Sequence, residues 1–281
     1  GEGGGGGGGC RGAGPRANSH EMNSIGVLHQ TESRLEMAKS CYSAAIKAQP
    51  SFAMAYFNMG TLHMAMGQHR QAIQSFATVV SLQPSYAAAF YNTGSALLQM
   101  GRSREAASNF QRAIDVDPNY VHAHSNLAWV MQMQGDLEGA KRHHQASIRI
   151  DPGFADGWMN LGNVLKELGQ LDGAVQAYET ATALNPSHAT ALYNLGVAHF
   201  AKGSTESAIK AYQASIGLEP KFAKSHYNLG LCFQYLGRAH EAIAALEAAT
   251  GLDPDSFESY NNLGTSLDQM GRVGEAIGAY E

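Results

Sequence analysis

Residues 155–188 read ADGWMNLGNVLKELGQLDGAVQAYETATALNPSH, and this stretch decides the fold. Trp158, Leu161 and Leu165 recur at i, i+3 and i+7, which places them on one face of a helix. A glycine then permits a sharp turn, and a second apolar face with helical spacing follows. Pro186 ends the helical geometry of that second segment. The stretch therefore predicts two short helices joined by a tight turn.

This unit recurs along the chain with a constant step of 34 residues. Seven prolines keep the step: Pro50, Pro84, Pro118, Pro152, Pro186, Pro220 and Pro254. Seven glycines keep it too, with Ala128 in their single gap: Gly26, Gly60, Gly94, Gly162, Gly196, Gly230 and Gly264. Helix pairs this short cannot bury their apolar faces alone. Neighbouring units must therefore stack on one another.

The pattern resembles the tetratricopeptide repeat, a 34-residue unit with an aromatic, Leu-Gly, a later aromatic, Ala and Pro. The resemblance covers residues 19–281, in units that start at Ser19, Ala53, Ala87, Val121, Ala155, Ala189, Ala223 and Phe257. It implies an all-α, right-handed superhelical solenoid, with first helices lining a concave groove and second helices outside. The eighth unit stops inside its second helix without the polar cap of a solenoid end. We therefore expect a fragment of a longer polypeptide.

Composition narrows the class of protein. The net charge of −5 argues against a nucleic-acid partner, which calls for a basic face. No apolar run reaches the roughly 18 residues of a membrane span, and three cysteines are too few for a disulfide framework. These features predict an intracellular protein, cytoplasmic or nuclear. Residues 1–18 are Gly-rich and are predicted to form a disordered tail, in which Cys10 is the only thiol expected to be reactive.

No catalytic motif is present. The glycine run 3–9 has no Gly-Lys-Ser/Thr after it, and no His-Glu-x-x-His, Gly-x-Ser-x-Gly or Cys-x-x-Cys occurs. The adjacent residues His143 and His144 would point about 100° apart on a helix, so they cannot chelate one ion from one face. We therefore expect a chain that is not an enzyme in itself, with no metal site and no cofactor.

One set of polar residues also recurs with the 34-residue step and is not accounted for by helix packing. This column consists of Asn58, Asn92, Asn126, Asn160, Asn194, Asn228 and Asn262. Each Asn precedes the Leu-type residue of a first helix and is turned from the buried stripe toward the groove. An amide offers a donor and an acceptor, the complement of a peptide group. The column therefore predicts a ladder that holds the backbone of an extended peptide; the alternative is that each Asn supports its own helix or its neighbour.

Aromatic residues stand beside this ladder. Tyr91, Tyr193 and Tyr227 each precede an Asn of the column, and rigid rings in a groove suit protein recognition. The alternative is that these rings pack against the next unit. Trp129 lies three residues after Asn126 on the predicted groove side, where it is a candidate anchor. A clamp for a C-terminal carboxylate, as in tetratricopeptide co-chaperones, is rejected because Met159 stands where its first Lys belongs.

Three functions remain open. The first is a non-catalytic interaction scaffold that binds an extended peptide or partner segment in its concave groove. The second rests on a resemblance of residues 158–169, WMNLGNVLKELG, to the repeat arm of the O-linked N-acetylglucosamine transferases. It implies a substrate-recognition arm whose catalytic domain lies outside this chain. The third is an architectural subunit of a large complex, ciliary or cell-cycle. The partner in each case is a protein or peptide, and the oligomeric state is not predicted.

Overall fold

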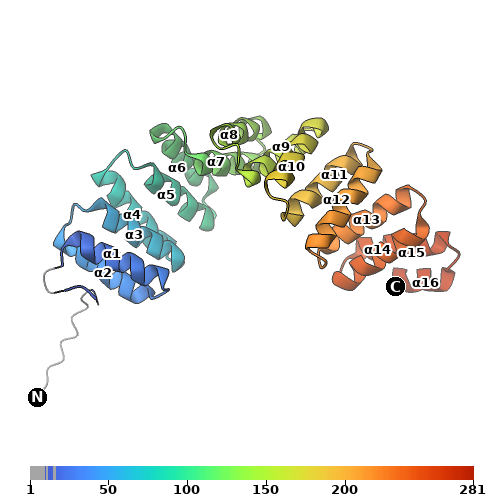
Figure 1. Cartoon of the computed structure of the whole chain (residues 1–281), viewed down its shortest axis with the longest axis horizontal. Coiled ribbons are helices and arrows are strands. Elements are labelled where there is room, and N and C mark those ends of the chain that lie inside the picture. The colour runs from blue at the N-terminus through green and yellow to red at the C-terminus, as the bar shows by residue number, and fades with distance from the viewer. Residues whose placement is uncertain (1–9, 11, 15–16) are drawn as a thin grey trace, which may run out of the picture. The chain divides into compact units, whose positions relative to one another are not determined.

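The computed structural model describes residue 10, residues 12–14 and residues 17–281. The described part contains sixteen helices and no strand (Figure 1). Most of the predicted tail, residues 1–18, lies outside the described residues. Contacts divide the chain into two units, residues 1–135 and 136–281, and the boundary falls inside the fourth repeat. A single continuous domain over 19–281 therefore stays a prediction, while the prediction of an all-α solenoid of repeats is confirmed.

Unit 1 contains α1 (Ser19–Thr31), α2 (Leu35–Ala48), α3 (Ala53–Ala65), α4 (His69–Leu82), α5 (Ala87–Gln99), α6 (Ser103–Val116) and α7 (Val121–Met133). Unit 2 contains α8 (Leu137–Ile150), α9 (Ala155–Glu167), α10 (Leu171–Leu184), α11 (Ala189–Ala201), α12 (Thr205–Leu218), α13 (Ala223–Tyr235), α14 (Ala239–Leu252), α15 (Phe257–Gln269) and α16 (Val273–Tyr280). The predicted unit starts at 19, 53, 87, 121, 155, 189, 223 and 257 coincide with the first residues of the odd-numbered helices.

The two helices of a repeat approach closely because a glycine of the first helix faces a large side chain of the second. A Cβ atom on Gly162 would lie 2.6 Å from the ring of Tyr178, which is fully buried. The same arrangement recurs in most repeats, with Phe76, Phe110 or Tyr212 as the ring. The turn between the helices requires a positive φ, which Gly169 supplies at 73°. The glycines that recur every 34 residues are therefore required for the two helices of a repeat to pack closely.

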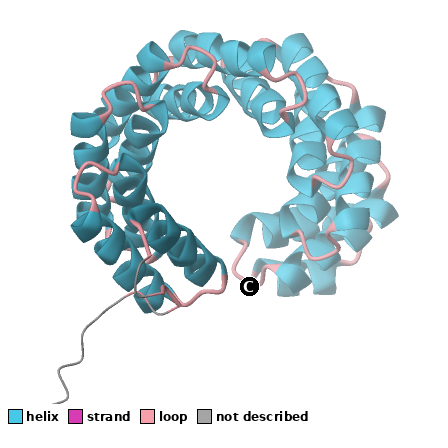
Figure 2. Cartoon of the chain, turned by 60° about the vertical axis from the view of Figure 1, so that its left-hand side comes forward, coloured by secondary structure: helices cyan, strands magenta, loops and turns pink. Residues whose placement is uncertain are grey.

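Within each unit the odd-numbered helices form one layer and the even-numbered helices the other (Figure 2). Successive odd helices contact one another, as α1 and α3 do in unit 1 and α9 and α11 do in unit 2. Even helices show no comparable contact among the described residues. Each unit therefore bends toward its odd helices, and the surface that they form is called the odd-helix face below.

The expectation for Cys10 was wrong. Cys10 forms a disulfide with Cys41 of α2, with Cα atoms 4.1 Å apart. Gly12, which precedes α1, lines one shallow depression together with Ile25 of that helix. The disulfide joins Cys10 to a residue 31 positions away. The free thiol, Cys232, is buried, and burial raises its pKa to about 12, so it is not reactive either.

The fourth repeat departs from the common pattern. It carries Ala128 in the glycine column and His144 in the ring column. His144 is fully buried, and neither of its ring nitrogens has a hydrogen-bond partner in the part of the chain that the structure describes. Burial, together with the neighbouring His143, lowers the pKa of His144 to about 4. The folded protein therefore holds this imidazole neutral.

Replacing Gly162 by Ala is expected to lower the free energy of unfolding by about 1–3 kcal/mol, because the new methyl group overlaps the buried Tyr178 ring. Gly217→Ala in α12 is the matched control, since nothing lies within 4 Å of its added Cβ. That variant should gain up to about 1 kcal/mol from helix propensity. Urea unfolding followed by circular dichroism measures both. Equal effects of the two changes would contradict the packing argument.

Acid should destabilise the protein through His144. Its folded-state pKa of about 4 lies below the unfolded value of 6.5, so only the unfolded chain takes up this proton as pH falls between these values. The loss is about 1.4 kcal/mol per pH unit. His144→Leu, with the residue that stands as Leu246 in repeat seven, should remove this part of the slope. Unfolding free energies at pH 7 and 5 test this, and an unchanged slope in the variant would exclude His144 as its source.

Candidate peptide-binding face

The seven asparagines of the column lie on odd-numbered helices, from Asn58 on α3 to Asn262 on α15, and all are half-buried. Six of the seven precede a residue that the helix buries against the core, such as Leu161 after Asn160 or Leu229 after Asn228; Asn92 precedes the half-buried Thr93. The backbone of each helix therefore places the amide at the border between the core and the odd-helix face. The three asparagines of unit 1 and the four of unit 2 form one row in each unit.

Three of the amides are tied to a tyrosine of the preceding repeat. The Nδ2 groups of Asn126, Asn228 and Asn262 donate hydrogen bonds of 3.2 Å to the hydroxyls of Tyr91, Tyr193 and Tyr227, respectively. In each pair the Tyr lies 35 residues earlier, one position before the Asn of its own repeat. The Tyr and Asn columns are thus coupled, and the sequence analysis considered them separately.

The remaining N–H group of two amides is also used. Nδ2 of Asn228 donates to the backbone carbonyl of Lys224 at 3.1 Å, and Nδ2 of Asn262 donates to that of Glu258 at 2.8 Å. A carbonyl oxygen only accepts, so these bonds fix the orientation of both amides. Their own carbonyl oxygens have no partner among the described residues. These two positions of the row can therefore accept an N–H from a ligand and have no N–H to give.

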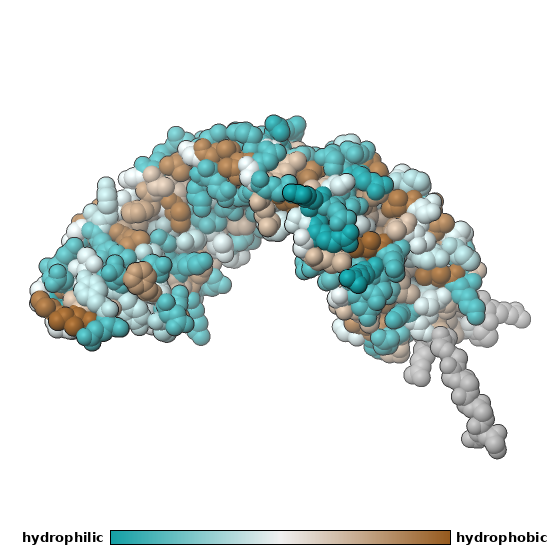
Figure 3. Space-filling view, turned by 180° about the vertical axis from the view of Figure 1, so that it is seen from behind, coloured by the Kyte–Doolittle hydropathy of each residue, from teal (hydrophilic) through white to brown (hydrophobic). Residues whose placement is uncertain are grey.

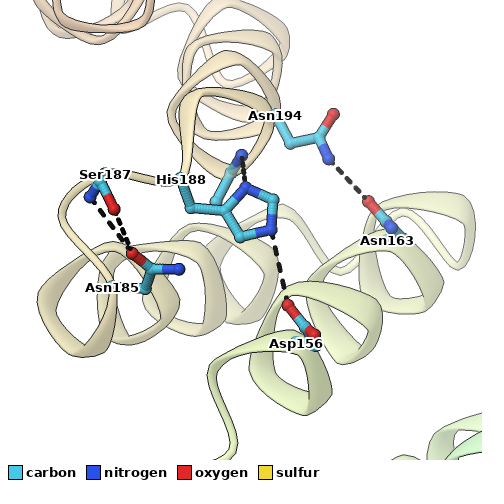
Figure 4. A network of polar contacts seen from close by, with 7 residues as sticks. Asp156, Asn163, Asn185, Ser187, His188 and Asn194 are labelled. Carbon is cyan, nitrogen blue, oxygen red and sulfur yellow. Dashed lines mark hydrogen bonds and ion pairs between the residues drawn. The ribbon is translucent and has the colours of Figure 1, made fainter. Parts of the chain in front are cut away.

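Where no Tyr precedes, the Asn bonds elsewhere. Asn92 follows a repeat with Phe57 and donates to the backbone carbonyl of Ala88 at 2.9 Å. Asn194 follows a repeat with Met159 and donates to Oδ1 of Asn163 at 3.2 Å (Figure 4). In unit 1, Asn58 donates to Oδ1 of Asn23 at 3.0 Å. A Tyr 35 positions upstream therefore decides whether an amide bonds to a hydroxyl of the preceding repeat.

The aromatic residues beside the row are packed between repeats. The ring of Tyr91 lies 5.1 Å from that of Tyr120, and the ring of Tyr193 lies 5.2 Å from that of Phe222. Burial raises the pKa of Tyr193, while the bond from Asn228 acts in the opposite direction. The rings of Tyr91 and Tyr193 thus pack against the segment that leads into the next repeat, which was the alternative to a role in binding. Both side chains are half-buried, so part of each ring remains exposed on the odd-helix face.

Among the aromatic residues predicted to bind the ligand, Trp129 is the exposed one. It is 46% exposed on α7, in the register that holds Thr61 on α3. Met133 follows one helical turn later and is 62% exposed. Met133 was not among the residues predicted from the sequence, although its i, i+4 spacing from Trp129 is the signal of a shared helix face.

A polar network in unit 2 was also missed. Oδ1 of Asn163 accepts from the hydroxyl of Tyr178 at 2.7 Å as well as from Asn194. Nearby, Nε2 of His188 lies 3.5 Å from a carboxylate oxygen of Asp156, and its Nδ1 accepts from the backbone N–H of Ala191 at the start of α11 (Figure 4). These bonds join α9, α10 and α11, so they order the repeat interface next to the Asn row.

The end of unit 2 at α16 is apolar (Figure 3). Val273 and Ile277 are both 53% exposed. One repeat earlier, Ile243 of α14 occupies the place of Ile277 and is buried in a cluster with Leu263 of α15. The side of α16 that would receive a following helix is therefore open in this chain.

Comparison with protein families agrees with this architecture. Models described as TPR repeat or tetratricopeptide repeat match residues 22–52, 51–119, 91–153, 145–176, 162–203, 198–237 and 227–281. Together they run without a break from residue 22 to residue 281. The chain belongs to the tetratricopeptide repeat family. Each of these models describes a repeat, and none describes an enzyme. No curated protein sequence matches the chain.

Solved structures with a similar fold include MamA, YrrB and a complex, the APC/C hetero-tetramer Cut9-Hcn1. MamA is 27% identical with a TM-score of 0.53, over 55% of this chain and 90% of its own. YrrB, described as a TPR protein with an unusual peptide-binding site, is 22% identical with a TM-score of 0.57, over 66% and 95%. The APC/C hetero-tetramer Cut9-Hcn1 is 16% identical with a TM-score of 0.63, over 90% and 53%. The last two show the fold alone.

Two other kinds of site are absent from the residues that the structure describes. No three His, Cys, Asp or Glu side chains in that part of the chain come together as a metal site requires. None of the helices that the structure describes has the length and apolarity to cross a bilayer.

The Tyr–Asn pairs should stabilise the stack. Tyr193→Phe and Asn228→Ala each remove the bond between repeats six and seven, at a net cost of about 0.5–1.5 kcal/mol. In a double-mutant cycle the two changes should be non-additive by a similar amount, because the second removes a bond that is already lost. Urea unfolding of the three variants and the parent measures this. Strict additivity would show that the hydrogen bond contributes nothing to stability.

Proposed function

We propose that this tetratricopeptide repeat chain is a non-catalytic scaffold that binds an extended peptide or partner segment along its odd-helix faces. The observation that carries the proposal is the way the Asn amides are held. The side-chain N–H groups of Asn228 and Asn262 donate to groups within the protein, whereas the side-chain carbonyl oxygens have no partner among the described residues. An extended peptide supplies one backbone N–H per residue, which is the group that such an oxygen accepts.

The spacing of the row supports an extended ligand. Successive odd helices lie about 10 Å apart, and an extended chain rises about 3.3 Å per residue. Each Asn therefore meets about every third residue of the ligand. Side chains of the ligand between these contacts face the solvent or the half-exposed rings of Tyr91, Tyr193 and Tyr227. Trp129 serves as an apolar anchor at the end of the row in unit 1.

The same fold holds peptides elsewhere, since YrrB is described as having a peptide-binding site. The two other functions predicted from the sequence, an arm of an O-linked N-acetylglucosamine transferase and an architectural subunit of a large complex, stay predictions. Both also place a protein or peptide on this surface. They differ from the scaffold in what lies beyond the chain, and no contact in the structure favours either.

The test needs a ligand, which a screen of the whole chain against an array of 12-residue peptides supplies. Asn228→Ala should weaken the best peptide by about 2- to 13-fold, the cost of one hydrogen bond. Changing Asn160, Asn194 and Asn228 together should weaken it by one to three powers of ten. Tyr193→Phe is the matched control, because it removes the same bond between repeats and leaves the carbonyl of Asn228 in place. Fluorescence anisotropy measures the affinities.

The outcome separates a binding role from a structural one. If Asn228 binds the peptide, Tyr193→Phe loses similar stability and keeps the parent's affinity within about twofold. If both variants lose stability and both bind like the parent, the row is structural only. That result would remove the Asn row from the proposed site.

A further inference from the structure

Charge is divided unevenly between the helices of unit 1. Helices α3, α5 and α7 are 13 residues long and contain no Asp, Glu, Lys or Arg, in a chain with 15% charged residues. Helix α1 has Glu21 alone, and its carboxylate accepts from the backbone N–H of Asn18 in the capping box. The charged side chains of the helices in unit 1 otherwise lie on the even layer, as Lys39, Arg70 and Arg112 do.

A depression of about 370 Å³ lies on this uncharged face. It is lined by Val27, Gln30, Thr31, Tyr42, Asn58 and Thr61, which places it between α1 and α3. Its polar groups are neutral hydroxyls and amides that already bond one another. The hydroxyl of Tyr42 donates to Oε1 of Gln30 at 2.8 Å, and that of Thr61 donates to the backbone carbonyl of Asn58 at 2.9 Å. Hydroxyl oxygens that donate still accept, so the depression offers neutral hydrogen-bonding groups.

Apolar side chains complete the face. Met54 is 41% exposed on α3, and Trp129 and Met133 are exposed on α7. Thioether side chains adapt to ligands of different shape, and an exposed indole supplies a large contact area. From the depression to α7 is about two and a half repeats, or roughly 25 Å at 10 Å per repeat. An extended segment of about eight residues spans that distance.

A face without charged side chains favours uncharged ligands. A charged ligand group that is brought onto it loses water and finds no side chain of opposite charge, which costs free energy. Uncharged residues such as Ser, Thr, Asn, Ala, Val and Tyr carry no such cost. The odd helices of unit 2 differ, because they include Asp156, Lys166 and Lys224 and therefore offer charges for pairing.

We propose that the odd-helix face of unit 1 binds an uncharged extended segment of a partner protein, with one end in the depression between α1 and α3 and the other against Trp129. This inference rests on the proposed function, because it names the ligand class for one of the two rows. It makes neutrality of the ligand the source of selectivity. Acidic, basic and phosphorylated segments are disfavoured on this face.

The experiment selects 12-residue peptides from a random display library on the full 281-residue chain. Peptides bound by unit 1 should be depleted in Asp, Glu, Lys and Arg. Their dissociation constant should change less than about twofold between 0.05 and 0.5 M NaCl, because no ion pair is screened. Thr61→Asp should weaken them about tenfold or more by placing a charge in the depression.

Thr265→Asp is the matched control. Thr265 holds the same repeat position on α15 in unit 2, is half-buried like Thr61, and also donates to a backbone carbonyl of its own helix, that of Asn261. It should leave the selected peptides bound within about twofold. Thr61→Ser, which keeps a neutral hydroxyl at this position, should do the same, and circular dichroism of all three variants shows whether the helices persist.

Several results overturn the inference while the proposed function stands. These are a high content of charged residues, or an affinity that falls tenfold with salt, among the peptides that Thr61→Asp weakens, and equal loss of binding in Thr61→Asp and Thr265→Asp. A concentration-dependent dimer that Thr61→Asp converts to monomer would show that a second copy of the chain occupies the face. If the library yields no peptide that any substitution on either odd-helix face weakens, the proposed function fails and this inference fails with it.

Discussion

The close approach of two helices over a glycine is the contact on which the rest of the structure depends. Gly162 of α9 lies against the ring of Tyr178, and six of the eight repeats share this arrangement of a glycine and a ring. The absence of one side chain lets a fully buried ring fill the space between the helices. Because the ring and the glycine recur together in these six repeats, their helix pairs can approach one another equally closely. A regular helix pair is what allows the next repeat to stack in the same way.

Regular stacking in turn aligns the polar columns. A Tyr and an Asn that are 35 residues apart meet only if consecutive odd helices keep one spacing and one rotation. Three such pairs show the same distance of 3.2 Å. In Asn228 and Asn262 a second bond, to the backbone carbonyl of Lys224 or Glu258, fixes the orientation of the amide, so its oxygen faces a ligand with or without the tyrosine hydroxyl. The bonds between repeats therefore hold the stack, while the backbone of the helix itself sets which atom of the Asn faces a ligand.

The sequence predicted where each repeat begins but did not predict the contacts between repeats. A step of 34 residues in proline and glycine predicted the start of every odd helix, because periodic small and helix-ending residues act locally. The orientation of the amides depends on a residue one repeat upstream, as the difference between Asn92 and Asn126 shows. The Cys10–Cys41 bond depends on where the chain before α1 lies, which no local pattern records. Disulfides persist in oxidising surroundings, so this bond stands against the predicted intracellular location, which remains a prediction.

The charged side chains of the helices in unit 1 lie almost entirely on the even helices, so the odd-helix face of that unit is nearly uncharged. Charged residues on the even helices keep the outer layer hydrated, so the inner layer needs none for solubility. A face without charge does not attract a partner over distance, because steering requires a net field. Its affinity must then arise from short-range contacts, whose strength falls steeply with small errors in position. An amide held by its neighbours loses little freedom when a ligand arrives. The bonds between repeats therefore matter most on the face where charge contributes least.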